Sequence, residues 1–263
     1  MSTRPPHAAK KRFGQNFLHD PQVIDRILRS IDPRPGQALV EIGPGLGALT
    51  RPLLERSGAL TVIEIDREVI PHLQTACAGL PGLRVVQADA LRVDFRAFAS
   101  ADSPLRVVGN LPYNISTPLL FHLLGQADAV RDMHFMLQKE VVDRMCAAPG
   151  DGAYGRLTVA LAARCAVSHL FDVGPGAFRP APKVDSAIVR LVPRTPDFAI
   201  ADLAVFDRVV TRAFAQRRKT LANTLKGLAD PATIERAGID PRVRAETLHA
   251  RDFARLAGLL GGH

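Results

Sequence analysis

The chain has no tryptophan, only two tyrosines and only three cysteines among its 263 residues. The cysteines, Cys77, Cys146 and Cys165, are far apart and form no CxxC pair, and no two histidines have the spacing of metal ligands. An odd number of scattered cysteines is typical of a reducing compartment and provides no framework for a structural zinc. We therefore expect neither a disulfide framework nor a bound metal.

Long apolar runs are also missing. None approaches the roughly 20 residues that a membrane-spanning helix needs. The N-terminus is basic but has no apolar stretch behind it, so it does not resemble a secretory signal. These absences predict a cytoplasmic protein with no membrane partner.

Positive charge is in excess, and the two ends of the chain carry all of it. Of the net charge of +8, half comes from residues 1–12, which carry four basic side chains and no acidic one. The other half comes from residues 199–263, with 11 basic and 7 acidic side chains, while residues 13–198 hold 19 of each sign. Basic ends around a neutral body indicate a polyanionic partner. Solvated surface charge is the alternative, and a basic tail by itself does not decide between them.

Apolar runs typical of buried strands alternate with stretches of helical spacing. Strands are expected at 38–42, 60–64, 84–87, 105–109, 133–137, 167–173 and 187–192, and helices at 46–56, 66–78, 117–124, 139–147 and 157–166. This alternation predicts an α/β fold with a mostly parallel, doubly wound, Rossmann-like sheet.

Two prolines, Pro193 and Pro196, indicate a linker, and every segment beyond them looks helical. Six apolar residues between Phe206 and Leu228 lie close to one helical stripe. We expect a catalytic domain over 1–198, with a basic N-terminal arm, and a small all-helical domain over 199–263.

A glycine-rich segment follows the first expected strand, with Gly43, Gly45 and Gly47 behind Glu41. Glycines at this position let the backbone approach a ligand closely, and the helix N-terminus behind them favours negative groups. The segment also satisfies the loose dinucleotide-binding pattern, and a purely structural turn is a further alternative.

Acidic residues follow the next two strands. Glu64 ends the second strand, where a carboxylate can accept ribose hydroxyls; Asp66 either competes for that role or caps the next helix. Asp89 follows the third strand and can accept a hydrogen bond from an adenine amine, although an ordinary helix cap or Asx turn is the alternative. None of these acids separates a nicotinamide cofactor from S-adenosylmethionine.

The segment after the fourth strand, N-L-P-Y-N-I-S-T-P at 110–118, decides between them. The amine of adenine is a poor nucleophile because its lone pair is delocalised into the ring. Accepting both N–H bonds, with the Asn110 side-chain oxygen and a backbone carbonyl, favours a pyramidal nitrogen with an outward lone pair. Pro112 stiffens the loop, and Tyr113 can stack on the base and favour the developing cation. A packed Pro-bearing turn does not account for nine such residues.

Residues 110–113 resemble the N-[LI]-P-Y motif of the adenine-N6 ribosomal RNA methyltransferase family. The likeness covers nearly the whole chain, because four other segments resemble family blocks: 13–18, 138–140, 178–186 and 214–223. The resemblance implies a Rossmann-like domain that uses S-adenosylmethionine as methyl donor. Leu111, the Q-N-F-L segment at 15–18 and the R-R-K-T-L segment at 217–221 resemble the branch that dimethylates two adjacent adenines near the 3′ end of small-subunit RNA.

The resemblance also assigns roles. Asn16 and Leu18 are expected to touch the cofactor from the N-terminal arm. Gly43, with Gly45 in the same loop, is expected at its methionine end, Glu64 at its ribose and Asp89 at its adenine. Asn110 joins the cofactor site to the target amine. Tyr113 and Phe178 are expected to sandwich the target base, with Leu111 and Pro112 completing the catalytic set.

Basic side chains at both ends are the expected RNA contacts: Lys10, Lys11, Arg12, Arg217, Arg218 and Lys219. The expected partner is small-subunit ribosomal RNA in an immature 30S-type particle, bound by a monomer. Three alternatives stay open at this stage. One is a large-subunit methyltransferase conferring antibiotic resistance, which more often has N-I-P-Y. The others are a mainly non-catalytic assembly factor and, more distantly, a nicotinamide dehydrogenase.

Overall fold

The computed structural model describes residues 16–100, 102–112 and 115–261. Their main feature is a seven-stranded sheet in the order β4-β3-β2-β5-β6-β9-β7. The strands are β2 (Leu39–Ile42), β3 (Leu60–Glu64), β4 (Leu83–Gln87), β5 (Leu105–Asn110), β6 (Val130–Gln138), β7 (Cys165–Val173) and β9 (Ser186–Pro193). Neighbours from β4 to β6 pair in parallel, whereas β6 and β9 are antiparallel. The predicted mostly parallel, doubly wound sheet is confirmed.

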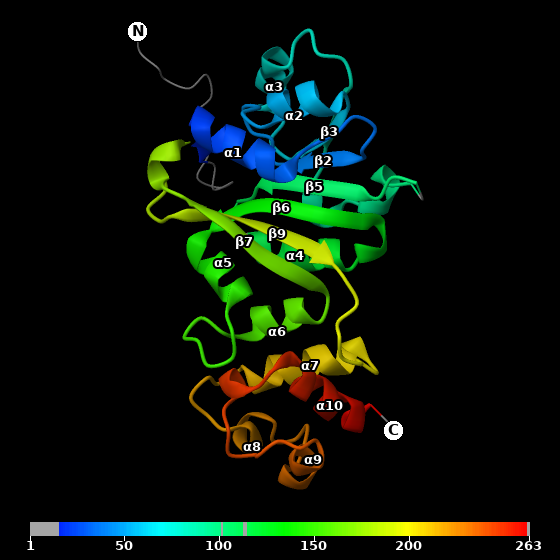
Figure 1. Ribbon diagram of the computed structural model, residues 1–263, viewed down its shortest axis with the longest axis vertical. Helices are drawn as coiled ribbons and strands as arrows, with labels where there is room; N and C mark the ends of the chain where they lie inside the picture. Colours follow the sequence, from blue (N-terminus) through cyan, green and yellow to red (C-terminus); the bar gives the residue numbers. More distant parts are fainter. Residues whose placement is uncertain (1–15, 101, 113–114, 262–263) are drawn as a thin grey trace. The chain divides into compact units, whose positions relative to one another are not determined.

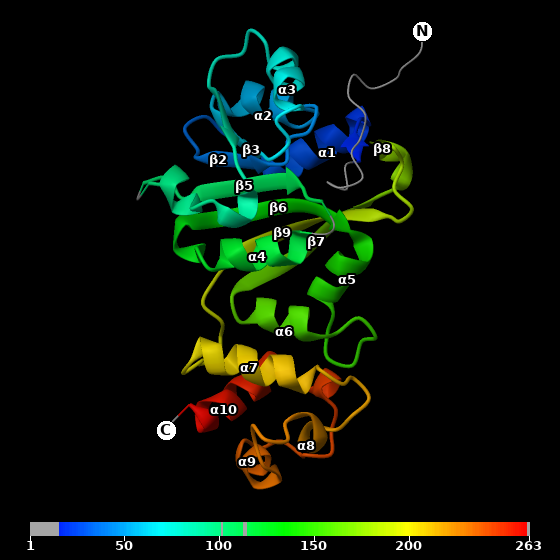
Figure 2. The ribbon, with the colours of Figure 1, turned by 180° about the vertical axis from the view of Figure 1, so that it is seen from behind.

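Helices cover both faces of this sheet. They are α1 (Pro21–Ile31), α2 (Thr50–Ser57), α3 (Ile70–Ala76) and α4 (Ser116–Leu124). Figure 1 shows α1 in front of the sheet, and the reverse view in Figure 2 shows α4 on the opposite face. The crossovers from β2 to β3, from β3 to β4 and from β5 to β6 each carry one of these helices, which can bury an apolar face against the sheet.

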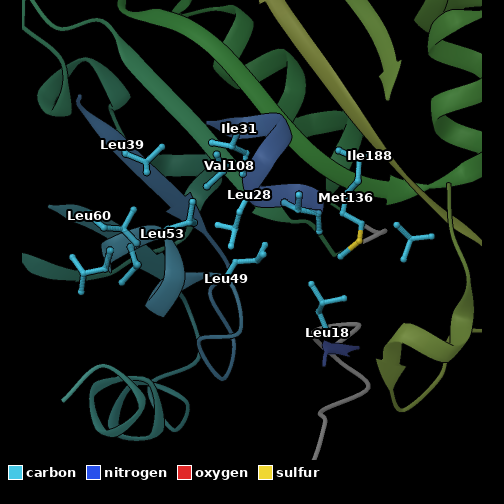
Figure 3. Close-up of a cluster of buried hydrophobic side chains, with 14 of the residues drawn as sticks. Leu18, Leu28, Ile31, Leu39, Leu49, Leu53, Leu60, Val108, Met136 and Ile188 are labelled. Atoms are coloured by element: carbon cyan, nitrogen blue, oxygen red, sulfur yellow. The ribbon is translucent and has the colours of Figure 1, made fainter. Parts of the chain in front are cut away.

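A hydrophobic core joins α1, α2 and α3 to the sheet. Leu28 and Ile31 of α1 lie beside Val108 of β5 in Figure 3, and Leu53 of α2 belongs to the same cluster. Leu53 and Val108 are completely buried. Because the strands β2 and β5 are buried on both faces, their sequences are nearly continuous apolar runs, and this explains why they were predictable from sequence.

One helix and two short strands beside the sheet were not predicted from the sequence. Helix α1 begins after Asp20, whose side chain accepts hydrogen bonds from the backbone N–H groups of Gln22 and Val23, with Pro21 in the first turn. This Asp-Pro pair is a helix-start signal in the sequence. By contrast, β1 (Phe17–Leu18) and β8 (Phe178–Arg179) are two-residue strands that pair with each other, and no periodicity identifies so short a ladder.

The chain divides into two compact units. Unit 1 comprises 1–142 and 168–193, and unit 2 comprises 143–167 and 194–263. This division differs from the expected domains in that 143–167 groups with the C-terminal helices. The physical reason is a shared core: Tyr154, Val159 and Ala163 pack in one cluster with Phe206 and Phe253.

Unit 2 is helical, as expected for its C-terminal part. Its helices include α6 (Arg156–Ala162), α7 (Leu203–Ala213), α8 (Leu221–Thr224), α9 (Pro231–Arg236) and α10 (Ala250–Leu260). Helix α5 (Lys139–Cys146) connects β6 to the segment that precedes α6.

The prediction that the apolar residues between Phe206 and Leu228 form a single helical stripe is wrong. Helix α7 ends at Ala213, and a turn precedes α8. The backbone N–H of Leu221 donates to the Val243 carbonyl, so it does not continue a helix from residue 217. The apolar residues do share one core, but they reach it from α7, from α8 and from the turns that follow these two helices. Arg217, Arg218 and Lys219 therefore lie in the turn and not on a helix face.

Candidate functional site

A cavity of about 290 Å³ lies at the carboxyl ends of β2, β3 and β5. Its lining includes every described residue that was predicted to contact the cofactor: Asn16, Leu18, Gly43, Gly45, Glu64, Asp89 and Asn110. Leu111 and Pro112 line it as well. The fold thus brings together residues that are far apart in the sequence, at the sheet edge where ligands bind in doubly wound folds.

The glycine loop after β2 forms one wall of the cavity. Gly43, Gly45 and Gly47 all have positive φ angles, between 55° and 88°, a region that favours glycine. A Cβ at Gly45 would approach the Phe17 ring to 3.2 Å, and one at Gly47 would approach Leu73 to 3.0 Å. These glycines both shape the turn and keep the space beside it open.

Glu64 and Asp66 are held in different roles. Glu64 lines the cavity, and its Oε1 accepts a hydrogen bond of 2.8 Å from the Asp66 backbone N–H. Burial raises the pKa of Glu64, against the opposing effect of this and other backbone hydrogen bonds. Asp66 instead accepts from the Glu68 backbone N–H and does not line the cavity. The ribose-binding alternative for Asp66 therefore has no support from its position.

Asp89 both caps a helix and lines the cavity, the two positions that the sequence left open for it. Its Oδ1 accepts a hydrogen bond of 3.0 Å from the Leu91 backbone N–H, so it caps the 3₁₀ helix that follows. Asp89 also lines the cavity. One carboxylate oxygen fixes the turn, and the second is available to a ligand except for a distant ion pair with Arg92 at 3.9 Å.

Glu41 lines the cavity but was not assigned a role from the sequence. It is only 2% exposed, and within the described part of the chain its Oε2 atom has no hydrogen-bond partner. Burial raises its pKa to about 8; the nearby Thr50 hydroxyl opposes this shift, and the Glu64 carboxylate adds to it. A buried carboxyl oxygen without a partner is costly, so this group is suited to a ligand that brings a positive charge. Its position two residues before Gly43 was the signal in the sequence that could have identified Glu41 as a cavity residue.

Asn110 ends β5 with its amide oriented by the chain. Its Nδ2 donates a hydrogen bond of 3.1 Å to the Asn16 backbone carbonyl. This contact commits the donor side of the amide, which leaves Oδ1 as an acceptor. The next residue, Leu111, is held by a hydrogen bond of 3.2 Å from its backbone N–H to the Met136 carbonyl.

Close strand packing positions Asn110 further. Gly109 precedes it, and a Cβ there would lie 2.5 Å from the Ile42 carbonyl oxygen. Any larger residue at 109 would therefore push β5 away from β2. From the sequence, Gly109 was predicted only as part of a strand, with no role in the site.

Phe178 is separate from the cavity lining. It lies in β8, opposite Leu18 of β1, and is 3% exposed within the hydrophobic core. The same two-residue ladder thus connects a residue assigned to the cofactor with one assigned to the target base. In this structure the Phe178 ring presents no face to solvent.

The remaining assigned residues fall in two places. Tyr113 and the basic residues Lys10, Lys11 and Arg12 lie outside the described residues. Arg217, Arg218 and Lys219 belong to unit 2, where all three are exposed.

Nowhere in the described ranges do three His, Cys, Asp or Glu side chains gather as a metal site would require. Likewise, no helix of the described chain is both long enough and apolar enough to cross a membrane.

Comparison with known proteins places the chain in a family. Residues 6–260 match the family described as "Ribosomal RNA adenine dimethylase". The chain is 56% identical over 258 residues to a protein of Hahella chejuensis, covering 98% of this chain and 94% of that protein. It is also 56% identical to a protein of Pseudomonas putida, covering 99% and 98% respectively. Both relatives carry the name "Ribosomal RNA small subunit methyltransferase A".

Solved structures of similar fold extend the comparison. A dimethyladenosine transferase from Plasmodium falciparum superimposes with a TM-score of 0.78 at 28% identity, covering 91% of this chain and 95% of that one. The 23S rRNA methyltransferase ErmE superimposes with a TM-score of 0.70 at 29% identity, covering 93% and 99%. The likeness therefore includes both units of the chain.

Proposed function

The chain belongs to the ribosomal RNA adenine dimethylase family, and we propose on this basis that it dimethylates N6 of two adjacent adenines near the 3′ end of small-subunit (16S) ribosomal RNA. It is an enzyme that uses S-adenosylmethionine as methyl donor. Relatives 56–58% identical along almost the full chain are named as small-subunit methyltransferases, so the small-subunit branch is favoured over the antibiotic-resistance branch. The single observation that carries the proposal is the convergence of the glycine loop, Glu64, Asp89 and Asn110 on one cavity.

The cavity residues fit S-adenosylmethionine. Glu41 offers a buried acceptor without a partner, which suits the positively charged methionine end of the donor. Glu64 would accept the ribose hydroxyls, and Asp89 would accept the adenine amine with the oxygen that does not cap its helix. Exposed Ile65, which also lines the cavity, provides an apolar surface for the adenine ring. The donor supplies a methyl group already activated on a positively charged sulfur, so we propose that transfer needs no metal.

Asn110 prepares the nucleophile. With Nδ2 donating to Asn16, the side-chain oxygen would accept one N–H of the target amine, and a backbone carbonyl of the adjoining turn would accept the other. These two acceptors pull the amine out of conjugation and direct its lone pair toward the methyl group. The effect is greatest where positive charge develops on nitrogen, and it therefore lowers the barrier more than it stabilises the bound substrate.

We retain the proposal that Tyr113 and Phe178 sandwich the target base. Because Phe178 is buried, this role requires the ring to turn outward when the base enters. An adenine in a single strand or loop should be preferred, since it is already unstacked.

The proposal extends to the form of the RNA substrate and to the state and location of the enzyme. The RNA substrate is presented in an immature 30S-type particle, and the enzyme acts on it as a monomer in the cytoplasm. Exposed basic side chains of unit 2 would contact RNA phosphates, and this contact gives the enzyme a second role as a participant in small-subunit assembly.

The test is to map the product. The protein is incubated with isotope-labelled S-adenosylmethionine and immature small subunits, and RNA fragments are analysed by mass spectrometry. We expect N6-dimethyladenosine at two adjacent positions near the 3′ end. Label in large-subunit RNA instead would favour the resistance branch, and absence of label with intact particle binding would favour the non-catalytic assembly factor.

A further inference from the structure

Residues 180–185, P-A-P-K-V-D, form a loop that we call the proline loop, and strands hold both of its ends. The loop follows β8, where Phe178 pairs with Leu18 of the cavity lining. It leads into β9, and the Asp185 carbonyl accepts a hydrogen bond of 2.9 Å from the Lys139 backbone N–H. The position of the proline loop is therefore fixed by the sheet and by the short ladder beside the cavity.

The register of the sheet gives the distance from this loop to Asn110. Asn110 of β5 pairs with Met136 of β6, which in turn pairs with Ile188 of β9. Because neighbouring strands are about 4.8 Å apart, Ile188 lies roughly 10 Å from Asn110. Ser186 pairs with Gln138, two positions further toward the carboxyl end of β6. The proline loop therefore projects from the same edge of the sheet that carries Asn110 and the cavity.

The proposed reaction requires RNA to cross the surface around this edge. The target amine must reach Asn110, whereas the nucleotides on either side of the target stay outside the cavity. Successive phosphates of one strand are about 3.4 Å apart along a duplex, so roughly three nucleotides cover the distance to β9. The proline loop is thus within reach of the nucleotides next to the target.

Val184 is an exposed apolar side chain on this loop. It is 42% exposed, and two prolines, Pro180 and Pro182, restrict the backbone before it. Its β-branched side chain has few rotamers, so little conformational entropy is lost when a ligand covers it. A single exposed valine is ordinary on a protein surface. Val184 differs in its restricted backbone and in its position beside the edge that carries Asn110.

Lys183 gives the loop a positive charge that is available to a ligand. Its side chain is exposed, and within the described chain no carboxylate pairs with its ammonium group, not even that of Asp185 two residues on. An apolar side chain next to a cation matches a nucleotide, which offers the face of a base and a phosphate. This charge complementarity favours RNA as the ligand of the loop.

We propose that the proline loop binds the RNA segment next to the target adenine, with Val184 covering the face of a neighbouring base and Lys183 contacting a phosphate. The inference rests on the proposed function, because the target adenine brings the RNA to this edge. Extruding one base leaves the next base without its stacking partner, which costs energy. Val184 replaces part of the lost stacking surface, as apolar side chains do where proteins unstack bases. The sheet-containing unit then has an RNA contact of its own.

Directed hydroxyl-radical probing tests where the loop lies on the RNA. Lys183→Cys carries iron–EDTA on its thiol in a Cys146→Ser background, because Cys146 is exposed whereas Cys77 and Cys165 are buried. Bound to immature small subunits, this protein should cleave the RNA within a few nucleotides of the two adenines. The matched control is Arg131→Cys, because Arg131 is exposed, has no ion pair within the described chain, and lies at the opposite end of β6. The control should not cleave there.

Kinetics test the contribution of Val184. Val184→Ala should raise KM for immature small subunits about three- to tenfold, because it withdraws apolar surface that RNA covers. The dissociation constant of S-adenosylmethionine should stay unchanged, and Val184→Ile, which keeps the apolar surface, should retain the wild-type KM. Leu203→Ala is the matched control, since Leu203 of α7 is 43% exposed but lies in unit 2. It should leave KM unchanged.

The salt dependence of binding tests the contribution of Lys183. Losing one phosphate contact lowers the log–log slope of affinity against salt by about 0.7–0.9, and we expect this change for Lys183→Ala. Arg131→Ala removes an equally exposed charge at the other end of β6 and should leave the slope unchanged.

Any one of three results would overturn the inference: no cleavage beside the two adenines from position 183, a normal KM for Val184→Ala, or a normal slope for Lys183→Ala. A loop that contacts a protein of the particle instead would give a raised KM without cleavage of RNA at that place. The mapping of methyl groups tests the proposed function separately. Wild-type protein that dimethylates the two adenines while cleavage falls elsewhere would refute this inference and leave the proposed function standing.

Discussion

Asn110 and Glu41 both line the cavity, but the chain holds them differently. Asn110 has its donor group occupied by Asn16 and its acceptor available. Glu41 has a buried oxygen with no partner in the described chain. The first arrangement leaves an acceptor for the target amine of the proposed reaction, and the second is an unfavourable burial that a cationic ligand can relieve.

Replacing Asn110 with alanine should lower the rate of methyl transfer about 10²–10³-fold, the usual effect of removing one group that acts where charge develops. Single-turnover kinetics would measure the rate, and circular dichroism would check the fold. Binding of S-adenosylmethionine should weaken much less than the rate. A variant with near-normal turnover would show that Asn110 is only structural.

Glu41 predicts a pH-dependent stability. The native state holds its proton up to about pH 8, whereas the ordinary pKa is 4.5. Between these values the native state binds more protons than the unfolded chain, so the free energy of unfolding falls as pH rises, by at most a few kcal/mol. Urea unfolding at about pH 5 and about pH 8.5, on either side of most of this window, should show this fall in the wild-type protein and a smaller one in Glu41→Gln. Equal falls would mean that Glu41 is not responsible.

At the scale of elements, one buried cluster joins α1 to the sheet. Arg106 of β5 donates to Asp132 of β6 at 2.8 Å, and to the Ile31 and Asp32 carbonyls at the end of α1. Its side chain is 7% exposed and that of Asp132 is 2% exposed. The guanidinium thus satisfies carbonyls that the helix itself leaves without partners.

Replacing Arg106 with alanine should destabilise the fold by about 3–5 kcal/mol, because it leaves a buried carboxylate and helix-end carbonyls without this partner. Arg190 also pairs with Asp132, at 3.1 Å, but its side chain is 45% exposed. Arg190→Ala is therefore the control and should cost about 1 kcal/mol or less. Chemical denaturation would measure both, and equal losses would contradict the special role of Arg106.

At the scale of the whole molecule, charge and chemistry are divided along the chain. The positive excess lies in residues 1–12 and 199–263, whereas the cavity residues come from the electrically neutral stretch between them. Attraction to RNA and binding of the methyl donor should therefore respond differently to salt.

Raising salt from about 50 to 200 mM should increase KM for immature small subunits by an order of magnitude or more if several phosphates are contacted. The dissociation constant for S-adenosylmethionine, measured by calorimetry over the same range, should change much less. A parallel change in both would show that the catalytic unit itself depends on the excess charge.

The sequence by itself determined most of the alternating strands and helices of the sheet-containing part, and several of the residues that line the cavity. Buried parallel strands require continuous apolar runs, and sheet edges place the residues that follow them together, so Gly43, Glu64, Asp89 and Asn110 were predictable. Only the tertiary structure decided what depends on long-range contacts. The pairing of β1 with β8 and the Glu41 oxygen that finds no partner within the described chain each depend on segments whose spacing in the sequence carries no periodic signal.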